Sequence, residues 1–286
     1  MLDGHPLVDA HLHPVRLSSL KQAWWDWAVR FGDRAVLERV YRDGDTPDPG
    51  EFAGHLRDEG VDVALLLCEY SPKTTGIQAI EDLLPLVEHD PELMRPIANL
   101  NPHMHHPIRE ELERQLASGA VACKIHPVHG GFPADERALY PAYEICRARG
   151  IPVVVHCGTS SFAGSTNAYA DPVHLDAVLR DFPGMNVVLA HGGRGWWYDA
   201  AAFLALANDN VWIELSGLPP SRLRGYYSRY DFARLSRRFI FGTDWPGMPG
   251  IARNARAVAA LCPDEETTGL VLGGNAHAVY NLTRPC

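Results

Sequence analysis

Eight short apolar runs recur along the chain, and segments long enough to form helices separate them. The runs cover 7–11, 61–70, 95–100, 120–127, 151–158, 186–193, 210–217 and 238–246. Most are apolar at consecutive positions, which is typical of strands buried on both faces of a parallel sheet. Eight strand–helix units in about 250 residues predict an α/β fold, a (β/α)8 TIM barrel. A doubly wound open sheet is the alternative, but no Gly-rich nucleotide-binding loop follows the first run.

The 286 residues contain no linker, low-complexity tract or short repeat, so we expect a single domain over 1–286. The segment 18–48 is long for a first strand–helix connection, and it holds Trp24, Trp25 and Trp27. We expect this segment to form a helical cap over the barrel mouth or an outer packing layer.

Composition excludes several classes of partner. The net charge of −9 leaves no basic surplus to neutralise nucleic-acid phosphates. The chain has no run of eighteen apolar residues to span a membrane and no visible export signal. Its six cysteines lack C-x-x-C spacing, which favours reduced thiols. We therefore expect a cytoplasmic protein with a small-molecule partner, and the aromatic loops are compatible with a homodimer.

Polar side chains appear where the apolar runs end. The carboxyl ends of the strands face the active site in a barrel of this kind. Side chains alternate along a strand, so two polar residues one position apart share a face. Five of the eight runs carry such residues, namely His11 and His13, Lys124 and His126, His156, His191, and Asp244.

A divalent metal ion explains this convergence. Neutral imidazoles and a carboxylate are common zinc ligands, and His11, His13, His156 and Asp244 supply three nitrogens and one oxygen. A fifth position would stay open for a water molecule, whose pKa the metal lowers towards roughly 7. Asp244 could accept the proton of this water, and His191 could polarise the substrate or orient the water. Each histidine taken alone could equally bond a loop carbonyl.

Lys124 allows three readings. It could bind a substrate carboxylate, form a structural ion pair, or be carboxylated and bridge two metal ions, because a desolvated lysine can lose its proton. His126 shares its face, so we place both residues in substrate binding. Arg194 is a candidate anchor for a carboxylate, which guanidinium binds in bidentate fashion, or else a partner in a loop ion pair.

Five motifs in order, "DAHLHP", "KIHP", "VVVHCG", "LAHGG" and "GTDWP", resemble the amidohydrolase superfamily. The closer similarity is to the amidohydrolase-2 branch, which includes aminocarboxymuconate-semialdehyde decarboxylase. The resemblance implies a metal-dependent barrel in which His11, His13 and His156 are ligands and Asp244 is a ligand and proton shuttle. His191 is implied to be catalytic with one metal ion or a ligand with two. The "KIHP" context favours one ion per chain. We expect zinc in preference to manganese or another divalent ion.

The resemblance implies two chemistries. The first is hydrolysis of a lactone, amide or related bond in a small organic substrate. The alternative is non-oxidative decarboxylation of an unsaturated or aromatic acid at the same site. A non-catalytic binding barrel is a third hypothesis, which the complete ligand set disfavours. A nucleophilic Cys157 beside His156 is disfavoured too, because adjacent strand residues point to opposite faces.

Overall fold

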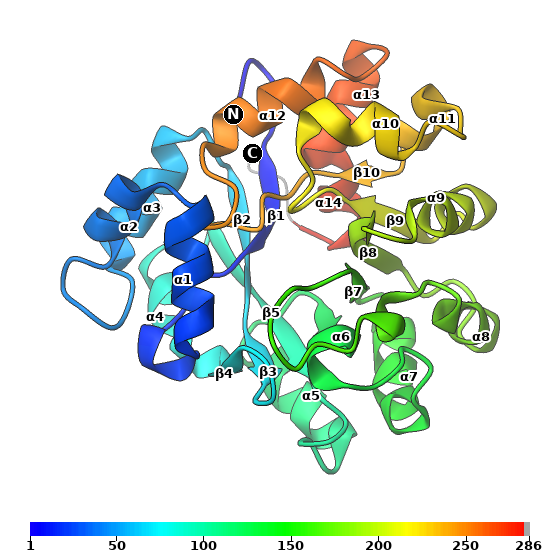
Figure 1. The fold of residues 1–286 in the computed structure, drawn as a ribbon, viewed down its shortest axis with the longest axis horizontal. Helices are drawn as coiled ribbons and strands as arrows, with labels where there is room; N and C mark the ends of the chain where they lie inside the picture. The colour runs from blue at the N-terminus through cyan, green and yellow to red at the C-terminus, as the bar shows by residue number, and fades with distance from the viewer. Residues whose placement is uncertain (283–286) are drawn as a thin grey trace.

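A sheet of eight parallel strands curls into a nearly closed barrel at the centre of the molecule (Figure 1). The computed structural model describes residues 1–282. The order of the sheet is β1-β2-β5-β6-β7-β8-β9-β10, so each strand lies beside the next. The strands are β1 Val8–Leu12, β2 Val63–Leu67, β5 Met94–Leu100, β6 Cys123–Ile125, β7 Val153–Gly158, β8 Val187–Arg194, β9 Val211–Glu214 and β10 Phe239–Ile240. All eight predicted strands form, and the predicted barrel is confirmed.

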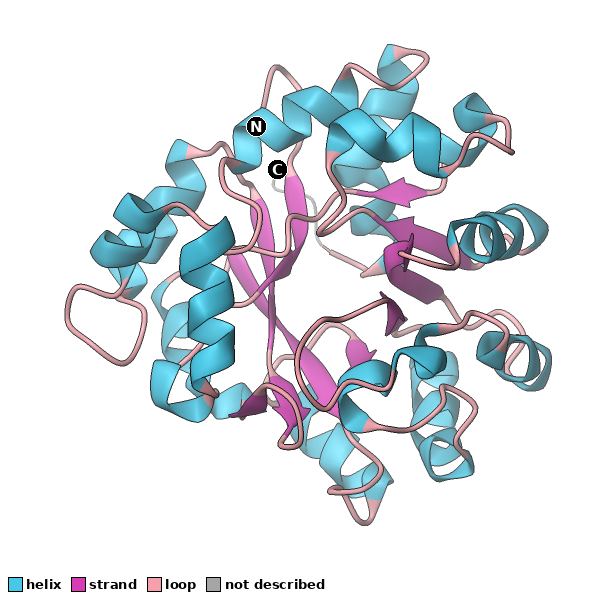
Figure 2. Ribbon diagram, in the orientation of Figure 1, coloured by secondary structure: helices cyan, strands magenta, loops and turns pink. Residues whose placement is uncertain are grey.

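Helices surround the barrel (Figure 2). Their amphipathic patterns explain how they pack; in α5, for example, Ile108 and Leu112 lie four residues apart and both are buried. The helices are α1 Gln22–Phe31, α2 Arg34–Val40, α3 Pro49–Asp58, α4 Leu84–His89, α5 Ile108–Ala117, α6 Pro127–Gly130, α7 Tyr140–Arg149, α8 His174–Asp181, α9 Tyr198–Ala207, α10 Leu223–Tyr226, α11 Phe232–Ser236, α12 Ile251–Ala259, α13 Glu265–Gly269 and α14 Asn275–Val279. A short antiparallel pair, β3 Glu69–Ser71 and β4 Gly76–Gln78, follows β2.

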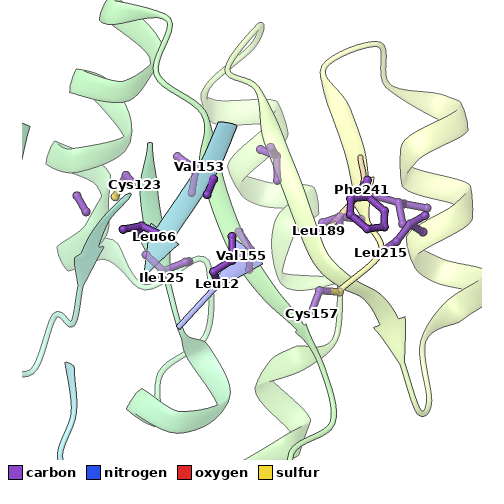
Figure 3. Close-up of a cluster of buried hydrophobic side chains, with 14 of the residues drawn as sticks. Leu12, Leu66, Cys123, Ile125, Val153, Val155, Cys157, Leu189, Leu215 and Phe241 are labelled. Carbon is purple, nitrogen blue, oxygen red and sulfur yellow. The ribbon is translucent and has the colours of Figure 1, made fainter. Parts of the chain in front are cut away.

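Alternation along the strands divides the apolar core into two layers. One set of side chains packs outward against the helices, and Figure 3 shows Leu66, Ile125 and Leu189 among them. The other set, which includes Leu65 and Val154, packs together inside the barrel. Both faces of each strand are therefore buried, which is why the runs read as continuously apolar. The inner layer continues at the carboxyl ends of the strands as polar residues.

The last contacts that close the barrel join β1 to the segment after β10. The Ala10 N–H donates to the carbonyl of Phe241 at 3.1 Å, and the His13 N–H donates to the carbonyl of Trp245 at 2.9 Å. Asp9, fully buried, accepts hydrogen bonds from both the backbone N–H and the hydroxyl of Thr243. Burial raises the pKa of Asp9 to about 7, while these hydrogen bonds oppose the rise. These hydrogen bonds hold β1 beside the segment after β10, and so bring the two histidines of the first motif close to Asp244 of the last.

The long connection after β1 contains α1 and α2. Trp24 and Trp27 of α1 line the cavity at the barrel mouth, and the ring centroids of Trp27 and Phe162 lie 6.1 Å apart in an edge-on arrangement. The indole of Trp27 lies where a Cβ on Gly247 would be, so this glycine is what allows the ring to approach the loop after β10. Helix α1 therefore forms one aromatic wall of the cavity.

Two further expectations concern the described part of the chain. No helix within residues 1–282 is long and apolar enough to cross a membrane. The five cysteines in that range are free thiols, and Cys286 lies outside the described residues. Cys157 is buried, its thiol bonds the carbonyl of Ala170, and burial raises its pKa to about 12. These features disfavour a nucleophilic role for this thiol.

Candidate metal and substrate site

A cavity of about 280 Å³ opens at the carboxyl ends of the barrel strands. Every residue that the sequence nominated for the site lines it, namely His11, His13, Lys124, His126, His156, His191, Arg194 and Asp244. The strands therefore bring together side chains spread over more than two hundred positions of the sequence.

A local irregularity of β1 aims its two histidines. Val8 and Ala10 pack inside the barrel, whereas Leu12 packs outward with Leu66. Strict alternation from Val8 would send His11 towards the helices. The pairing of β1 with β2 shifts register between Asp9 and Leu12, and this shift turns His11 and His13 towards the cavity.

The ligand atoms of His11, His13 and Asp244 converge. Nε2 of His11 lies 3.2 Å from Nε2 of His13. Oδ1 of Asp244 lies 3.7 Å from the first nitrogen and 3.6 Å from the second. Two imidazole nitrogens and a carboxylate oxygen at these separations are a donor set that fits a divalent cation.

Glu214 and Ser216, which the sequence reasoning missed, hold the His11 ring from behind. The Nδ1–H of His11 donates to Oε2 of Glu214 at 2.7 Å, so the Nε2 lone pair faces the cavity. Ser216 donates to the same carboxylate from its backbone N–H and its hydroxyl. Burial raises the pKa of Glu214 to about 8, yet all these surrounding donors favour its ionised form. A carboxylate–histidine pair of this kind orients metal ligands. Its signal in the sequence is Glu214 itself, an inward position of a buried strand.

His191 reaches the cavity through an unusual backbone conformation. Val188 and Ala190 face the barrel interior, so alternation alone would turn His191 outward. Its φ of +65° bends the strand instead, and Asp244 has a similar φ of +67°. Left-handed non-glycine residues store strain and cluster at functional sites. Nδ1–H of His191 donates to the Ser216 carbonyl at 3.0 Å, which leaves the Nε2 lone pair free. His11, His191 and Asp244 form one group with metal-compatible spacing.

His156 and His126 stack beside this group. Their ring centroids are 3.9 Å apart, and the His126 ring also stacks on His129 at 3.7 Å. Nε2–H of His156 donates to the Gly158 carbonyl, so in this rotamer its free lone pair is on Nδ1. Nδ1 of His126 accepts from the His129 backbone N–H. His156 is outside the metal-compatible groups, and its role as a ligand stays a prediction.

The buried histidines are held neutral. Burial lowers the pKa of His11, His126, His156 and His191 well below the usual value, and neighbouring positive groups lower it further. Neutral imidazole is the form that binds metal ions. The electrostatics of the cavity therefore agree with the donor geometry.

Lys124 and Arg194 supply the positive charge of the cavity. The Lys124 ammonium is buried and has no hydrogen-bond partner among the residues that the structure describes. Burial lowers its pKa to about 8, against the attraction of Glu214, Asp244 and other carboxylates. The Arg194 guanidinium donates to the Thr159 carbonyl and lies 3.9 Å from Asp244. Lys124 is thus the cation with bonding capacity to spare.

A second polar group lies beside His126, and two of its members, Glu69 and His129, were not expected from the sequence. Glu69 of β3 pairs with His129 of α6 at 2.8 Å, and Glu69, His126 and His129 have metal-compatible spacing. Burial alone would raise the pKa of Glu69, but its contacts, led by the hydrogen bond from His129, bring it down to about 2. Glu69 continues the inward alternation of Leu65 and Leu67, which is the signal that could have revealed it.

Comparison with known proteins agrees with the fold and the motifs. A sequence model of the Amidohydro_2 family, described as amidohydrolase, matches residues 8–282. The chain belongs to this amidohydrolase family. The match includes every residue of the site just described, so the resemblance seen in the sequence is confirmed. The chain is thus an enzyme of the metal-dependent amidohydrolase superfamily with candidate metal-binding groups.

One curated relative is a dihydroorotase from Delftia acidovorans. It is 32% identical over 131 residues, which are 42% of this amidohydrolase and 37% of the relative. The match thus spans well under half the length of that protein.

Solved structures share the fold across nearly the whole chain. An uncharacterised TIM-barrel protein from Bordetella bronchiseptica has a TM-score of 0.74 at 20% identity, with 97% of this chain and 99% of that one covered. A 5-carboxyvanillate decarboxylase from Novosphingobium aromaticivorans, complexed with manganese and a nitrobenzoic acid, has a TM-score of 0.67 at 14% identity. The match covers 98% of this chain and 97% of that one. A probable 2-pyrone-4,6-dicarboxylic acid hydrolase from Acinetobacter baumannii has a TM-score of 0.64 at 17% identity. The match covers 96% of this chain and 99% of that one.

Proposed function

We propose that this amidohydrolase is a metal-dependent hydrolase of a small organic substrate with a lactone, amide or related bond. The observation that carries the proposal is the convergence of His11 Nε2, His13 Nε2 and Asp244 Oδ1 within 3.7 Å of one another in the wall of a cavity of about 280 Å³. Three lone pairs this close repel one another unless a cation or proton lies between them.

In the proposal His11, His13, His156 and Asp244 hold one divalent cation, with zinc favoured over manganese. Such a cation supplies Lewis acidity and makes water a nucleophile at neutral pH. The carboxylate of Glu214 keeps the His11 ring in the tautomer that binding requires. His156 would contribute Nδ1 in its present rotamer.

The proton chemistry falls to Asp244 and His191. Asp244 accepts the proton of the attacking water on its carboxylate and passes it to the leaving group. His191 accepts a hydrogen bond from the water at Nε2, since its Nδ1–H is fixed on the Ser216 carbonyl. This arrangement orients the scissile group against the water.

Substrate binding falls to Lys124, Arg194 and His126. The Lys124 ammonium has no hydrogen bond among residues 1–282, so it would gain a partner from a substrate carboxylate, and Arg194 could take a second one. The rings of Trp27 and Phe162 at the mouth would pack against the apolar part of the substrate. We also propose that the protein is located in the cytoplasm and that it forms a homodimer.

The second candidate is a non-oxidative decarboxylase of an unsaturated or aromatic acid. The observation that favours it is the buried Lys124, which has no hydrogen bond among the described residues. Such a cation could hold the substrate carboxylate in the position from which it leaves as carbon dioxide. The fold shared with the manganese-containing 5-carboxyvanillate decarboxylase adds support. The dihydroorotase relative and the dicarboxylic acid hydrolase support hydrolysis in the same way.

Elemental analysis of protein purified without chelator tests the metal site first. We expect about one divalent ion per chain. The loaded protein is then offered lactones, cyclic amides and aromatic acids. Ring opening or amide cleavage supports the hydrolase, whereas carbon dioxide release with solvent deuterium on the product carbon supports the decarboxylase. Protein that holds no metal and takes none up overturns both.

A further inference from the structure

Three residues that line the cavity and take no part in the proposed metal ligand set form a continuous hydrogen-bond line. Oε1 of Glu69 lies 2.8 Å from Nδ1 of His129, and Nε2 of His129 lies 2.8 Å from Oγ of Ser160. They come from β3, α6 and the loop after β7, and all three line the cavity. The order carboxylate–imidazole–hydroxyl, with both links at hydrogen-bond distance, is the arrangement of an activated serine.

The neighbouring donors set the direction of each proton. The Thr75 hydroxyl donates to the same oxygen of Glu69 at 2.6 Å, so this carboxylate accepts and His129 donates through Nδ1–H. Ser160 Oγ accepts from the Phe162 N–H at 3.3 Å and from the Ser165 hydroxyl at 3.1 Å. The hydrogen of the Ser160 hydroxyl is therefore free to point at the Nε2 lone pair of His129.

The loop that carries Ser160 is held by its own contacts. The Ser160 N–H donates to the Asn167 side chain at 2.8 Å, and the Asn167 amide donates back to the Ser160 carbonyl at 3.1 Å. On the other side, the Thr74 hydroxyl donates to the His129 carbonyl at 2.7 Å. The hydroxyl and the imidazole are thus placed before any substrate arrives, which reduces the entropic cost of reaction.

A cation shared by Glu69, His126 and His129 is the competing interpretation, since their spacing suits one. Both ring nitrogens of His129 already have protein partners, so a cation could bind there only by displacing Glu69 or Ser160. The hydrogen bonds therefore favour a proton-transfer group over a second metal site.

We propose that Ser160, His129 and Glu69 form a nucleophilic triad that gives this cavity a second, metal-independent activity on small activated esters. Ser160 Oγ attacks the acyl carbon while its proton passes to His129 Nε2. His129 then returns the proton to the departing alkoxide, which leaves an acyl-serine and an alcohol. Water, deprotonated by His129, hydrolyses the acyl-serine to the free acid. Glu69 stays ionised and stabilises the imidazolium in both steps.

This activity is distinct from the proposed hydrolase, because no step uses His11, His13 or Asp244. Arg194 lines the same cavity and donates to the carbonyl of Thr159, the residue before Ser160, so a positive charge lies beside the loop that carries the nucleophile. The two proposals can consequently fail independently of each other.

A small dialkyl fluorophosphonate tests the triad on the full-length protein as purified. Attack by Ser160 forms an oxygen–phosphorus bond and releases fluoride, and the proton leaves through His129. Mass spectrometry should find one adduct on Ser160 and none in Ser160→Ala. His129→Gln should react at least about 100-fold more slowly, in line with the loss of a general base. Glu69→Gln should also slow the reaction while circular dichroism stays unchanged.

Ser161→Ala is the matched control. Ser161 lines the same cavity and is more exposed than Ser160, and its hydroxyl has no hydrogen bond to the described residues. Labelling should persist in this variant. An unlabelled Ser160, or equal labelling rates in the wild type and folded His129→Gln, would overturn the triad. Metal analysis of the same sample reports on the proposed hydrolase separately.

Discussion

Glu214 and His11 lie 203 positions apart in the chain, yet the Nδ1–H of His11 donates to the Glu214 carboxylate at 2.7 Å. Both side chains are buried, and Ser216 holds the same carboxylate with two further hydrogen bonds. The bond selects the tautomer of His11 that presents Nε2 to Asp244 and His13. An interaction outside the ligand set thus decides what one ligand can do.

Glu214→Gln should weaken metal binding by about 10- to 100-fold, because the amide cannot hold the imidazole as the carboxylate does. Competition against a chromogenic chelator measures the affinity, and circular dichroism checks the fold. Glu92→Gln is the control, since Glu92 is exposed. Equal affinities in both variants would show that Glu214 does not orient a ligand.

His13→Ala should lose the bound metal ion, because it removes one of the three converging donors. Asp244→Asn should bind the ion more weakly, because it replaces a carboxylate ligand with a neutral amide oxygen. Elemental analysis of the purified variants measures the loss. His89→Ala removes an exposed histidine and should keep the metal. Full metal content in both site variants, with intact folds, would contradict the proposed ligand set.

Lys124→Met should stabilise the protein and weaken substrate binding. The wild type buries an ammonium without a hydrogen bond among the described residues, and methionine fills much of the same space without the charge. The lowering of the pKa of Lys124 from 10.5 to about 8 corresponds to a cost of about 3 kcal/mol at neutral pH. Urea unfolding measures the gain. A less stable variant would mean that Lys124 has a hydrogen-bond partner in solution or is carboxylated there.

The stabilisation by Lys124→Met should depend on pH in a defined direction. Below pH 8 the Lys124 side chain is protonated in both the folded and the unfolded wild type, so the full cost of burying its charge applies. Between about pH 8 and 10.5 the folded state loses the proton first, and the wild type recovers stability. The difference between the two proteins should therefore shrink as the pH rises through this window. A difference that grows with pH would contradict the lowered pKa.

Gly247→Ala should disturb the aromatic wall of the cavity. Its Cβ would collide with the indole of Trp27, so the ring must move. We expect altered tryptophan fluorescence and a raised KM with little change in kcat. Gly54→Ala in α3 is the control, because a Cβ there meets no described atom within 4 Å. This control should gain up to about 1 kcal/mol of stability from helix propensity. Unchanged fluorescence and KM in Gly247→Ala would remove Trp27 from the proposed site.

The sequence alone determined the strand–helix repeat and the residues at the strand ends. Continuous apolar runs such as 153–155 and 187–190 form buried strands because of their local composition, whatever lies elsewhere in the chain. The carboxyl ends of parallel strands meet at one edge of the barrel. For that reason His11, Lys124, His156 and Asp244 could be assigned to one cavity before its geometry was known.

Only the tertiary structure decided how these side chains are aimed and supported. The register shift in β1 and the positive φ of His191 depend on the pairing of strands and on the loops above them. The contacts of Glu214 with His11, and of His129 with Glu69 and Ser160, join segments that barrel closure brings together. Local periodicity reports which face of a strand a residue occupies. It carries no information about which distant polar group completes a buried hydrogen bond, and that pairing sets the chemistry of the site.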